Sequence, residues 1–375
     1  MKPGLLLRVE RIVFSNHGGP HATIQGMSFL SLFRSMPRWR GPARYERAPH
    51  EATGWLVLEQ GPNPSSDYYV RPRVGQDGLP VRWRHVEKEV PCAEDLAPGT
   101  RVVIVRYLTP AWAAALRRAR HGLAGVVYFM DDELLDPSAW KTLPATYRKK
   151  LDRLCLQQAG SIAELTSEYW GSTPVLCDRY AERAMRLMPP LPLAEDAGRM
   201  PCPVRAGEPV QIFYHGSAVH LDEMRWLRPV IAEVLADCPQ AHFEVIGDHE
   251  VNRLFRDLPR TRVLHPMSWP NYLSHCRAMR GHIGLAPLLP GVFNAGRSKT
   301  KVFDIRRAGA RGVFSALPPY GPDVLAAGEG LCLPMEPVVW VDGLRALVQS
   351  VPSDGNRVQV AVEQARDSFG KAAGA

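Results

Sequence analysis

Short apolar runs alternate with longer amphipathic segments from residue 54 onward. The run "LAGVVYFMDDE" (123–133) is apolar almost to its end, which indicates a strand buried on both faces of a parallel sheet. Other apolar runs in this block are bounded by Gly, Pro or charged residues, as is typical of strands. The expected strands are 54–62, 100–107, 123–133 and 160–167, and the expected helices are 110–122, closed by Gly122, and 145–159.

The same alternation restarts after a proline-rich stretch at residues 189–208. Because proline interrupts helices and strands alike, this stretch is predicted to link two blocks. The second block has expected strands at 209–217, 241–248, 261–267, 281–288 and 310–317, and expected helices at 221–238, 269–279, 300–309, 341–351 and 356–372. Two blocks of alternating strands and helices predict an α/β protein with two Rossmann-like, doubly wound domains that face a cleft.

Composition excludes only a few classes of protein. The chain has 375 residues, of which 45% are hydrophobic and 22% charged, and it has no apolar run long enough to predict a membrane-spanning helix. The apolar patch near the start is broken by Arg8, Glu10 and Arg11, so it makes a poor signal peptide. Seven scattered cysteines without a CxxC pair argue against a disulfide framework or a zinc site and favour a reducing cytoplasm.

The net charge of +8 is concentrated at the front of the chain, where residues 1–50 hold eight Lys or Arg and two Glu. One interpretation is a poorly ordered basic extension. Another is a peripheral anchor for an anionic membrane, because this segment also carries the apolar stretch "MSFLSLF". Nucleic acid is a weaker alternative and is not expected as a partner, since the body of the chain lacks basic patches interleaved with aromatic residues.

The stretch "FNAGRSKTKVFD" (293–304) places Arg297 and Lys301 four residues apart after an apolar strand. If a helix begins near Ser298, these two cations share one face at its N-terminus. Cations there oppose the helix dipole, so the spacing predicts an anion bound between them.

A second candidate lies in "FYHGSAVHLD" (213–222), where a strand ends at His215 and Gly216 and Ser217 follow. Backbone N–H groups at such a turn can hold a phosphate, although glycine and serine also serve simple turn geometry. Both candidates follow strands of the same block, so we expect a diphosphate to bridge them. His215 and His220 are either cleft histidines or hydrogen-bonded structural ones.

Asp131 and Asp132 end the strand at 123–133. Adjacent side chains at a strand end diverge, so only one carboxylate is expected to face the cleft. That carboxylate, with Asp132 the first choice, could act as a general base for an acceptor hydroxyl. A helix cap or a salt bridge across the cleft is the alternative, and the spacing does not match a metal-binding DxD.

Several longer patterns resemble one known group of proteins. "HGS…H.D…RP", "FEVIGD", "IGLAPL…FN..RS..KVFD…AG…VFS..PPYG" and "GEGLCLP" are similar to the C-terminal domain of GT-B fold glycosyltransferases, with family 4, found in bacterial surface-polysaccharide synthesis, the closest type. The resemblance covers residues 54–350. It divides the chain into a basic extension (1–53), an acceptor-side domain (54–190), a linker (191–208), a nucleotide-sugar domain (209–350) and a C-terminal helix (351–375).

The resemblance also implies roles for individual residues. The implied donor-binding residues are Gly216, Ser217, Asn294, Arg297, Ser298, Lys301 and Asp304, and the implied catalytic candidates are Asp132, Asp131 and His215. Arg297 and Lys301 match the cations that neutralise the donor diphosphate. Asp304 stands where the family has a glutamate that grips the ribose, and Gly296 stands in place of the partner glutamate.

These patterns imply a cytoplasmic, metal-independent sugar transferase that needs no cofactor and retains the anomeric configuration. Its implied partners are a nucleotide-sugar donor and a glycan or lipid-linked saccharide acceptor, with peripheral membrane contact through residues 1–50. Because of Gly296 and Asp304, a non-catalytic subunit that binds polysaccharide or acts as a scaffold remains an alternative. A nucleotide-sugar epimerase on the same fold is a third.

Overall fold

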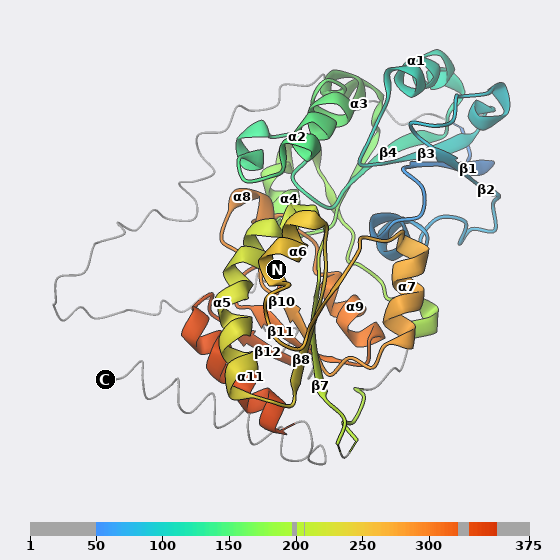
Figure 1. Cartoon of the computed structure of the whole chain (residues 1–375). Helices are drawn as coiled ribbons and strands as arrows, with labels where there is room; N and C mark the ends of the chain where they lie inside the picture. Colours follow the sequence, from blue (N-terminus) through green and yellow to red (C-terminus); the bar gives the residue numbers. More distant parts are fainter. Residues whose placement is uncertain (1–49, 197–200, 206, 322–329, 351–375) are drawn as a thin grey trace, which may run out of the picture. The chain divides into compact units, whose positions relative to one another are not determined.

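The computed structural model describes residues 50–196, 201–205, 207–321 and 330–350 (Figure 1). The predicted basic extension up to residue 49 and the predicted C-terminal helix at 351–375 lie outside the described residues. Among the described helices, none combines the length and the apolar composition needed to cross a bilayer.

The N-terminal half is built on a six-stranded sheet in which every neighbouring pair is parallel. The strand order is β2-β1-β3-β4-β5-β6, so the chain reverses its direction of winding between β1 and β3. The strands are β1 (Gly54–Glu59), β2 (Val81–His85), β3 (Thr100–Val105), β4 (Gly125–Met130), β5 (Glu168–Gly171) and β6 (Arg186–Leu187). Its α-helices are α1 (Pro110–Ala119), α2 (Ala145–Leu151), α3 (Ala159–Leu165) and α4 (Pro174–Arg179).

The C-terminal half has a second parallel sheet of six strands, in the order β12-β11-β10-β7-β8-β9. Read from β9, this is the 3-2-1-4-5-6 order of dinucleotide-binding domains, with its switch point between β7 and β10. The strands are β7 (Val210–His215), β8 (Ala241–Ile246), β9 (Thr261–Leu264), β10 (Ile283–Ala286), β11 (Arg311–Ser315) and β12 (Gly330–Leu333). The helices are α5 (Leu221–Asp237), α6 (His249–Phe255), α7 (Trp269–Ala278), α8 (Val292–Ala295), α9 (Lys301–Arg307) and α11 (Pro337–Ser350).

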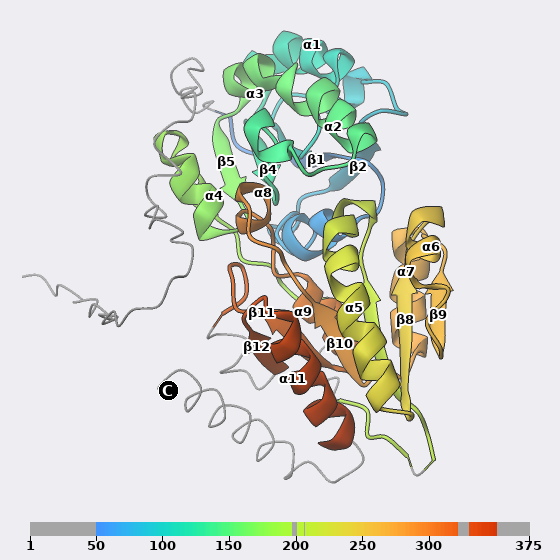
Figure 2. The same ribbon diagram turned by 60° about the vertical axis from the view of Figure 1, so that its left-hand side comes forward.

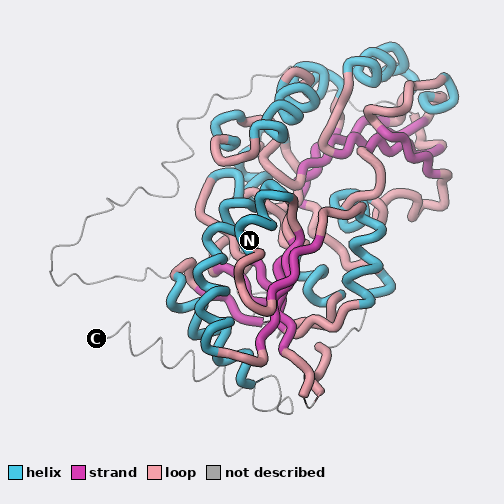
Figure 3. Tube along the Cα trace, in the orientation of Figure 1, coloured by secondary structure: helices cyan, strands magenta, loops and turns pink. Residues whose placement is uncertain are grey.

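Two separate sheets, each accompanied by helices, confirm the predicted fold class (Figure 3). The second sheet is covered on both faces, and most residues of its inner strands β7, β10 and β11 are therefore buried. Ile212 and Tyr214 pack under α5 and α11, which lie side by side in Figure 2. Phe213, which points to the opposite face, packs with Val302 and Ile305 of α9.

Two predictions about local structure were wrong. Residues 160–167 form most of α3 and not a strand, because Ile162, Ala163 and Leu165 bury one helical face. Helix α1 ends at Ala119, and residues 120–122 form a separate 3₁₀ turn, so Gly122 does not cap it. Helix α9 begins at Lys301, close to the start of the helix expected at 300–309, and Arg297 therefore lies in the preceding loop and not on the first turn of α9.

Candidate active site

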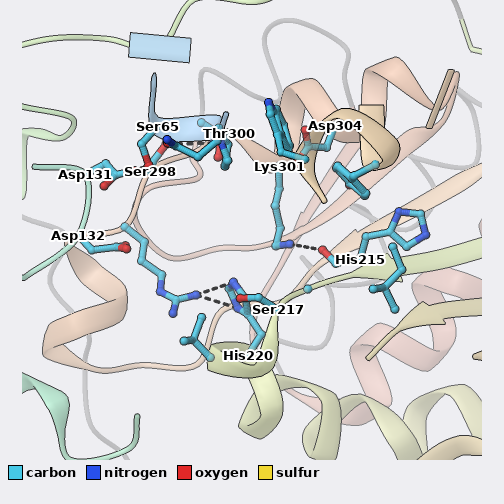
Figure 4. Close-up of a pocket in the computed structure, with 18 of the residues that line it drawn as sticks. Ser65, Asp131, Asp132, His215, Ser217, His220, Ser298, Thr300, Lys301 and Asp304 are labelled. Carbon is cyan, nitrogen blue, oxygen red and sulfur yellow. Dashed lines mark hydrogen bonds between the residues drawn. The ribbon is translucent and has the colours of Figure 1, made fainter. Parts of the chain in front are cut away.

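A pocket of about 630 Å³ lies where the switch points of the two sheets meet. In parallel sheets, ligands bind outside the carboxyl ends of the strands at such points. The N-terminal half contributes residues that follow β1, β3 and β4, and the C-terminal half contributes residues that follow β7, β8 and β10. Figure 4 shows Asp131 and Asp132 of the first half near Lys301 of the second half. The predicted residues that line the pocket are Asp131, Asp132, His215, Gly216, Ser217, Arg297, Ser298, Lys301 and Asp304.

Asn294 is the one predicted site residue that does not line the pocket. Its side-chain amide donates to the Glu223 carboxylate at 2.8 Å and to the Leu289 carbonyl at 2.9 Å. Asn294 therefore fixes the loop between β10 and α9 against Glu223 of α5, and its own side chain does not line the pocket.

Arg297 extends from this loop into the pocket although the residue is only 6% exposed. Its Nη1 atom lies 2.8 Å and 2.6 Å from the two ring nitrogens of His220, and its guanidinium lies 5.0 Å from the centre of the Phe293 ring. Burial, followed by the charge of Arg297, lowers the pKa of His220 to about 3, so the imidazole is neutral and can accept a hydrogen bond. Within the described residues, Nε of Arg297 has no hydrogen-bond partner and no carboxylate forms an ion pair with the guanidinium.

Lys301 is the first residue of α9, and its ammonium group donates to the carbonyl oxygen of His215. The Nζ atom lies 5.1 Å from the centre of the Tyr214 ring. Burial lowers the pKa of Lys301 to about 8, and the charge of Arg297 acts in the same direction, against that of Asp304. Two cations that have lost much of their hydration thus line one pocket, which favours an anionic ligand.

Glu223, on α5, is an acidic neighbour of these cations that sequence reasoning missed. Burial alone would raise its pKa, yet contact with His220 and the charge of Arg297 hold the pKa of Glu223 at about 2. Its charge therefore offsets part of the positive charge without forming a direct ion pair with Arg297. No sequence motif marks Glu223, because its role depends on how α5 packs against the loop after β10.

Gly216 leaves the backbone exposed to the pocket where β7 ends. A Cβ atom at this position would lie 3.1 Å from the Tyr214 hydroxyl and 3.2 Å from both His220 and Met224. A larger residue would therefore crowd the turn that carries Ser217. Ser298, on the opposite loop, contacts the Tyr69 hydroxyl of the N-terminal half.

Both carboxylates at the end of β4 face the pocket, so the expectation that only one would do so was wrong. Arg106 joins them: Nε lies 3.3 Å from Asp131, and Nη2 donates to Asp132 at 2.8 Å. Ser65 donates to the other oxygen of Asp131. Burial raises the pKa of Asp132, and the charge of Asp131 adds to this effect against that of Arg106.

Arg106 was missed because it lies inside the run predicted to be a strand. The strand ends at Val105, and Arg106 adopts a left-handed backbone conformation with φ of 67°. This conformation is uncommon for residues other than glycine and recurs at functional sites. Hydrogen bonds from the Tyr128 hydroxyl to the Arg106 carbonyl (2.9 Å) and from the Arg106 N–H to the Phe129 carbonyl (3.0 Å) hold it in place.

The remaining predicted residues have strong structural contacts. The ring of His215 is buried and its Nε2 atom lies 3.1 Å from Glu244, so only its carbonyl oxygen meets Lys301. Asp304 accepts hydrogen bonds from the Tyr68 hydroxyl at 2.6 Å and from Arg307 at 2.8 Å. Gly296 does not line the pocket; a Cβ atom there would lie 3.1 Å from Leu176 of α4.

No protein-family model matches the sequence, and no curated protein matches it. Similar solved structures include the pneumococcal O-GlcNAc transferase GtfA in complex with UDP and GlcNAc, with 13% identity, a TM-score of 0.43, and coverage of 75% of this chain and 57% of that one. A mutant of S. aureus TarM is 11% identical, with a TM-score of 0.45 and coverage of 75% of this chain and 53% of that one. The trehalose 6-phosphate synthase from Burkholderia multivorans is 10% identical, with a TM-score of 0.48 and coverage of 85% of this chain and 96% of that one.

The chain thus spans little more than half the length of the first two of these proteins.

Proposed function

We propose that the chain is a GT-B glycosyltransferase that moves a sugar from a nucleotide-sugar donor to a glycan or lipid-linked saccharide acceptor. The observation that carries this proposal is the pair of cations formed by the buried Arg297 and the partly buried Lys301, which face the pocket beside the backbone at Gly216. A diphosphate fits this arrangement because it brings two phosphate groups to two cations that lack carboxylate partners in the described part of the chain. The planar fork of Arg297 matches two phosphate oxygens, whereas Lys301 acts as a point charge.

In this proposal the cations act mainly on the transition state. The bond from the anomeric carbon to the phosphate oxygen breaks as the bond from that carbon to the acceptor oxygen forms. Negative charge grows on the leaving diphosphate, and fixed cations in a buried site stabilise it without rearranging. Arg297 and Lys301 would thereby supply the charge that other transferases obtain from a metal ion, which supports a metal-independent reaction.

Asp132 is the proposed base for the acceptor proton. It lines the pocket, and burial raises its pKa toward the range in which a carboxylate accepts protons effectively. Arg106 holds the carboxylate at 2.8 Å and so acts as a positioning residue. If the anomeric configuration is retained, as the resemblance to family 4 implies, the departing phosphate oxygen lies near the acceptor and competes with Asp132 for the same proton.

Two observations favour a second candidate, a non-catalytic subunit with a related fold. Asp304 is already held by Tyr68 and Arg307, and position 296 faces α4, so neither supplies a free carboxylate to a ribose or a sugar. A protein of this kind would bind a nucleotide or a glycan without turnover. An epimerase would isomerise the donor and release no nucleotide.

The test is a panel of UDP-, GDP-, dTDP- and ADP-sugars, scored by thermal shift and by release of nucleoside diphosphate. A ligand present at a hundredfold excess over its Kd stabilises the native state by about 2.7 kcal/mol. Stabilisation by one nucleotide together with its slow release without acceptor supports the transferase. Binding without any release supports the non-catalytic subunit, and no shift with any member of the panel would refute a donor site here.

The cellular setting rests on residues 1–50. Their excess of Lys and Arg supports a cytoplasmic protein held at the inner face of an anionic membrane. Such a location would bring the pocket near lipid-linked acceptors, consistent with a role in surface-polysaccharide synthesis.

A further inference from the structure

Three side chains that could bind a metal ion lie close together behind the pocket. They are His215 at the end of β7, Glu244 in β8 and His275 in α7. Nε2 of His215 lies 3.1 Å from Oε1 of Glu244, and Nε2 of His275 lies 2.8 Å from the same oxygen. The ligand atoms of all three lie within 4.8 Å of one another. This His–Glu–His cluster is not used by the proposed transfer reaction, in which only the carbonyl of His215 takes part.

The sheet explains why these residues meet. In the parallel pairing of β7 with β8, Phe213 lies opposite Glu244, and His215 lies opposite Ile246. Side chains two residues apart on a strand share a face, so His215 and Glu244 point to the same side of the sheet. Helix α7 covers that side and presents His275 to Glu244.

We propose that His215, Glu244 and His275 bind a divalent transition-metal ion of the zinc class, with water completing the coordination. Two imidazoles and one carboxylate are a ligand set that zinc accepts, whereas magnesium and calcium prefer oxygen ligands alone. Ligands of a tetrahedral zinc ion with bonds of about 2.1 Å lie about 3.4 Å apart, so the cluster needs only small side-chain movements. The site is independent of the donor-site assignment.

The surroundings set the protonation states that a metal requires. Burial lowers the pKa of His215, and contacts with both histidines lower the pKa of Glu244 against the effect of its own burial. The His215 imidazole is therefore neutral, and Glu244 is an ionised carboxylate, near neutral pH. When Nε2 of His215 binds the ion, the ring proton moves to Nδ1, which faces Sγ of Cys276 at 4.0 Å.

A metal ion must be able to reach the three side chains and must compete with Arg262 for Glu244. The His275 side chain is 22% exposed and provides an entry path, while the side chains of His215 and Glu244 are 2% and 7% exposed. Arg262 lies 3.8 Å from the other oxygen of Glu244, but its side chain is 70% exposed and can turn into solvent. A bound ion would join β7, β8 and α7 behind the carbonyl that Lys301 contacts.

The test uses the untagged full-length chain, stripped of metal with a chelator and titrated calorimetrically with Zn²⁺, and then with Co²⁺ while its visible absorption is recorded. The informative variant is His275→Gln, because glutamine can still donate to Glu244 but is a poor zinc ligand. The control is His265→Gln, since His265 is an exposed histidine in the loop after β9. Melting temperatures check that both variants are folded.

We expect one Zn²⁺ per chain, a Co²⁺ spectrum of low coordination number, and a loss of affinity of more than about 100-fold in His275→Gln with no loss in the control. Equal Zn²⁺ binding by wild type and His275→Gln would overturn the proposal, because any bound ion would then belong to other histidines. The absence of a saturable site in the wild-type chain would overturn it as well. The cluster would then be a hydrogen-bonded network around a buried carboxylate.

Discussion

Replacing Arg297 with methionine should raise the stability of the free protein and weaken nucleotide binding. Arg297 is almost fully buried against the Phe293 ring, and Nε has no hydrogen-bond partner among the described residues. Replacing a buried ion pair by apolar side chains of similar volume is often stabilising by about 1–4 kcal/mol, and Arg297→Met would leave behind no ion-paired carboxylate among the described residues. Loss of the hydrogen bond to His220 lowers the stability by about 1 kcal/mol. We therefore expect a net gain of about 0–3 kcal/mol in the free energy of unfolding.

The effect on binding has the opposite sign. A hydrogen bond between charged groups contributes about 1.5–3 kcal/mol, so Arg297→Met should weaken nucleoside-diphosphate binding about 10- to 150-fold. Calorimetric titration with the nucleotide identified by the panel measures this loss. Thermal unfolding without nucleotide measures the gain, at about 2–4 °C per kcal/mol for a domain of 150–250 residues.

Arg307→Met is the matched control. Arg307 is fully buried, but it donates to Asp196 and Asp304. Removing it leaves the buried Asp196 and the partly buried Asp304 without their nearest cation, which should cost about 3–5 kcal/mol of stability. If Arg297→Met loses stability as Arg307→Met does and keeps its nucleotide affinity, Arg297 is a structural cation, and the donor-site assignment is refuted.

Three further changes test other parts of the molecule. Asp132→Asn should lower kcat while donor affinity stays near wild type, because the base acts in the transition state; unchanged kcat would remove Asp132 from the mechanism. His220→Gln should flatten the acid dependence of stability. Its folded-state pKa of about 3 lies below the ordinary 6.5, so its contribution is complete above pH 6.5 and is lost as the pH falls toward 3. Equal slopes of unfolding free energy against pH in the two proteins would contradict this. Deleting residues 1–49 should reduce binding to anionic vesicles at low salt and leave nucleotide binding unchanged; equal vesicle binding would rule out the anchor.

The sequence predicted most strands because buried parallel strands need apolar residues on both faces. All of β4 and β10 is buried, and both strands were expected. Strand β2, "VRWRH", was missed because it lies at the edge of its sheet, where Arg and His side chains reach solvent. Helix α6 was missed as well, since its seven residues bury only Val251 and Phe255.

The site was predictable only where charged residues recur at a spacing that points to a ligand. Arg297 and Lys301 come after β10, and the polarity of their loop distinguishes them from the strand before it. Arg106 escaped notice because its role depends on a left-handed backbone conformation that no residue pattern marks. Asn294 was assigned to the donor by the resemblance alone, whereas in the folded chain its amide donates to Glu223.

The hydrogen-bond network around Arg307 also bears on the order in which the protein folds. Arg307 meets Asp196 across 111 residues of sequence and Tyr68 across 239, while Tyr68 meets Asp304 across 236. Closing such long loops is entropically costly, so these bonds form only after each sheet has assembled around its own core. Interactions that form late affect the unfolding rate more than the folding rate. A change such as Tyr68→Phe should therefore shorten the lifetime of the native state while the chain continues to fold at nearly its original speed.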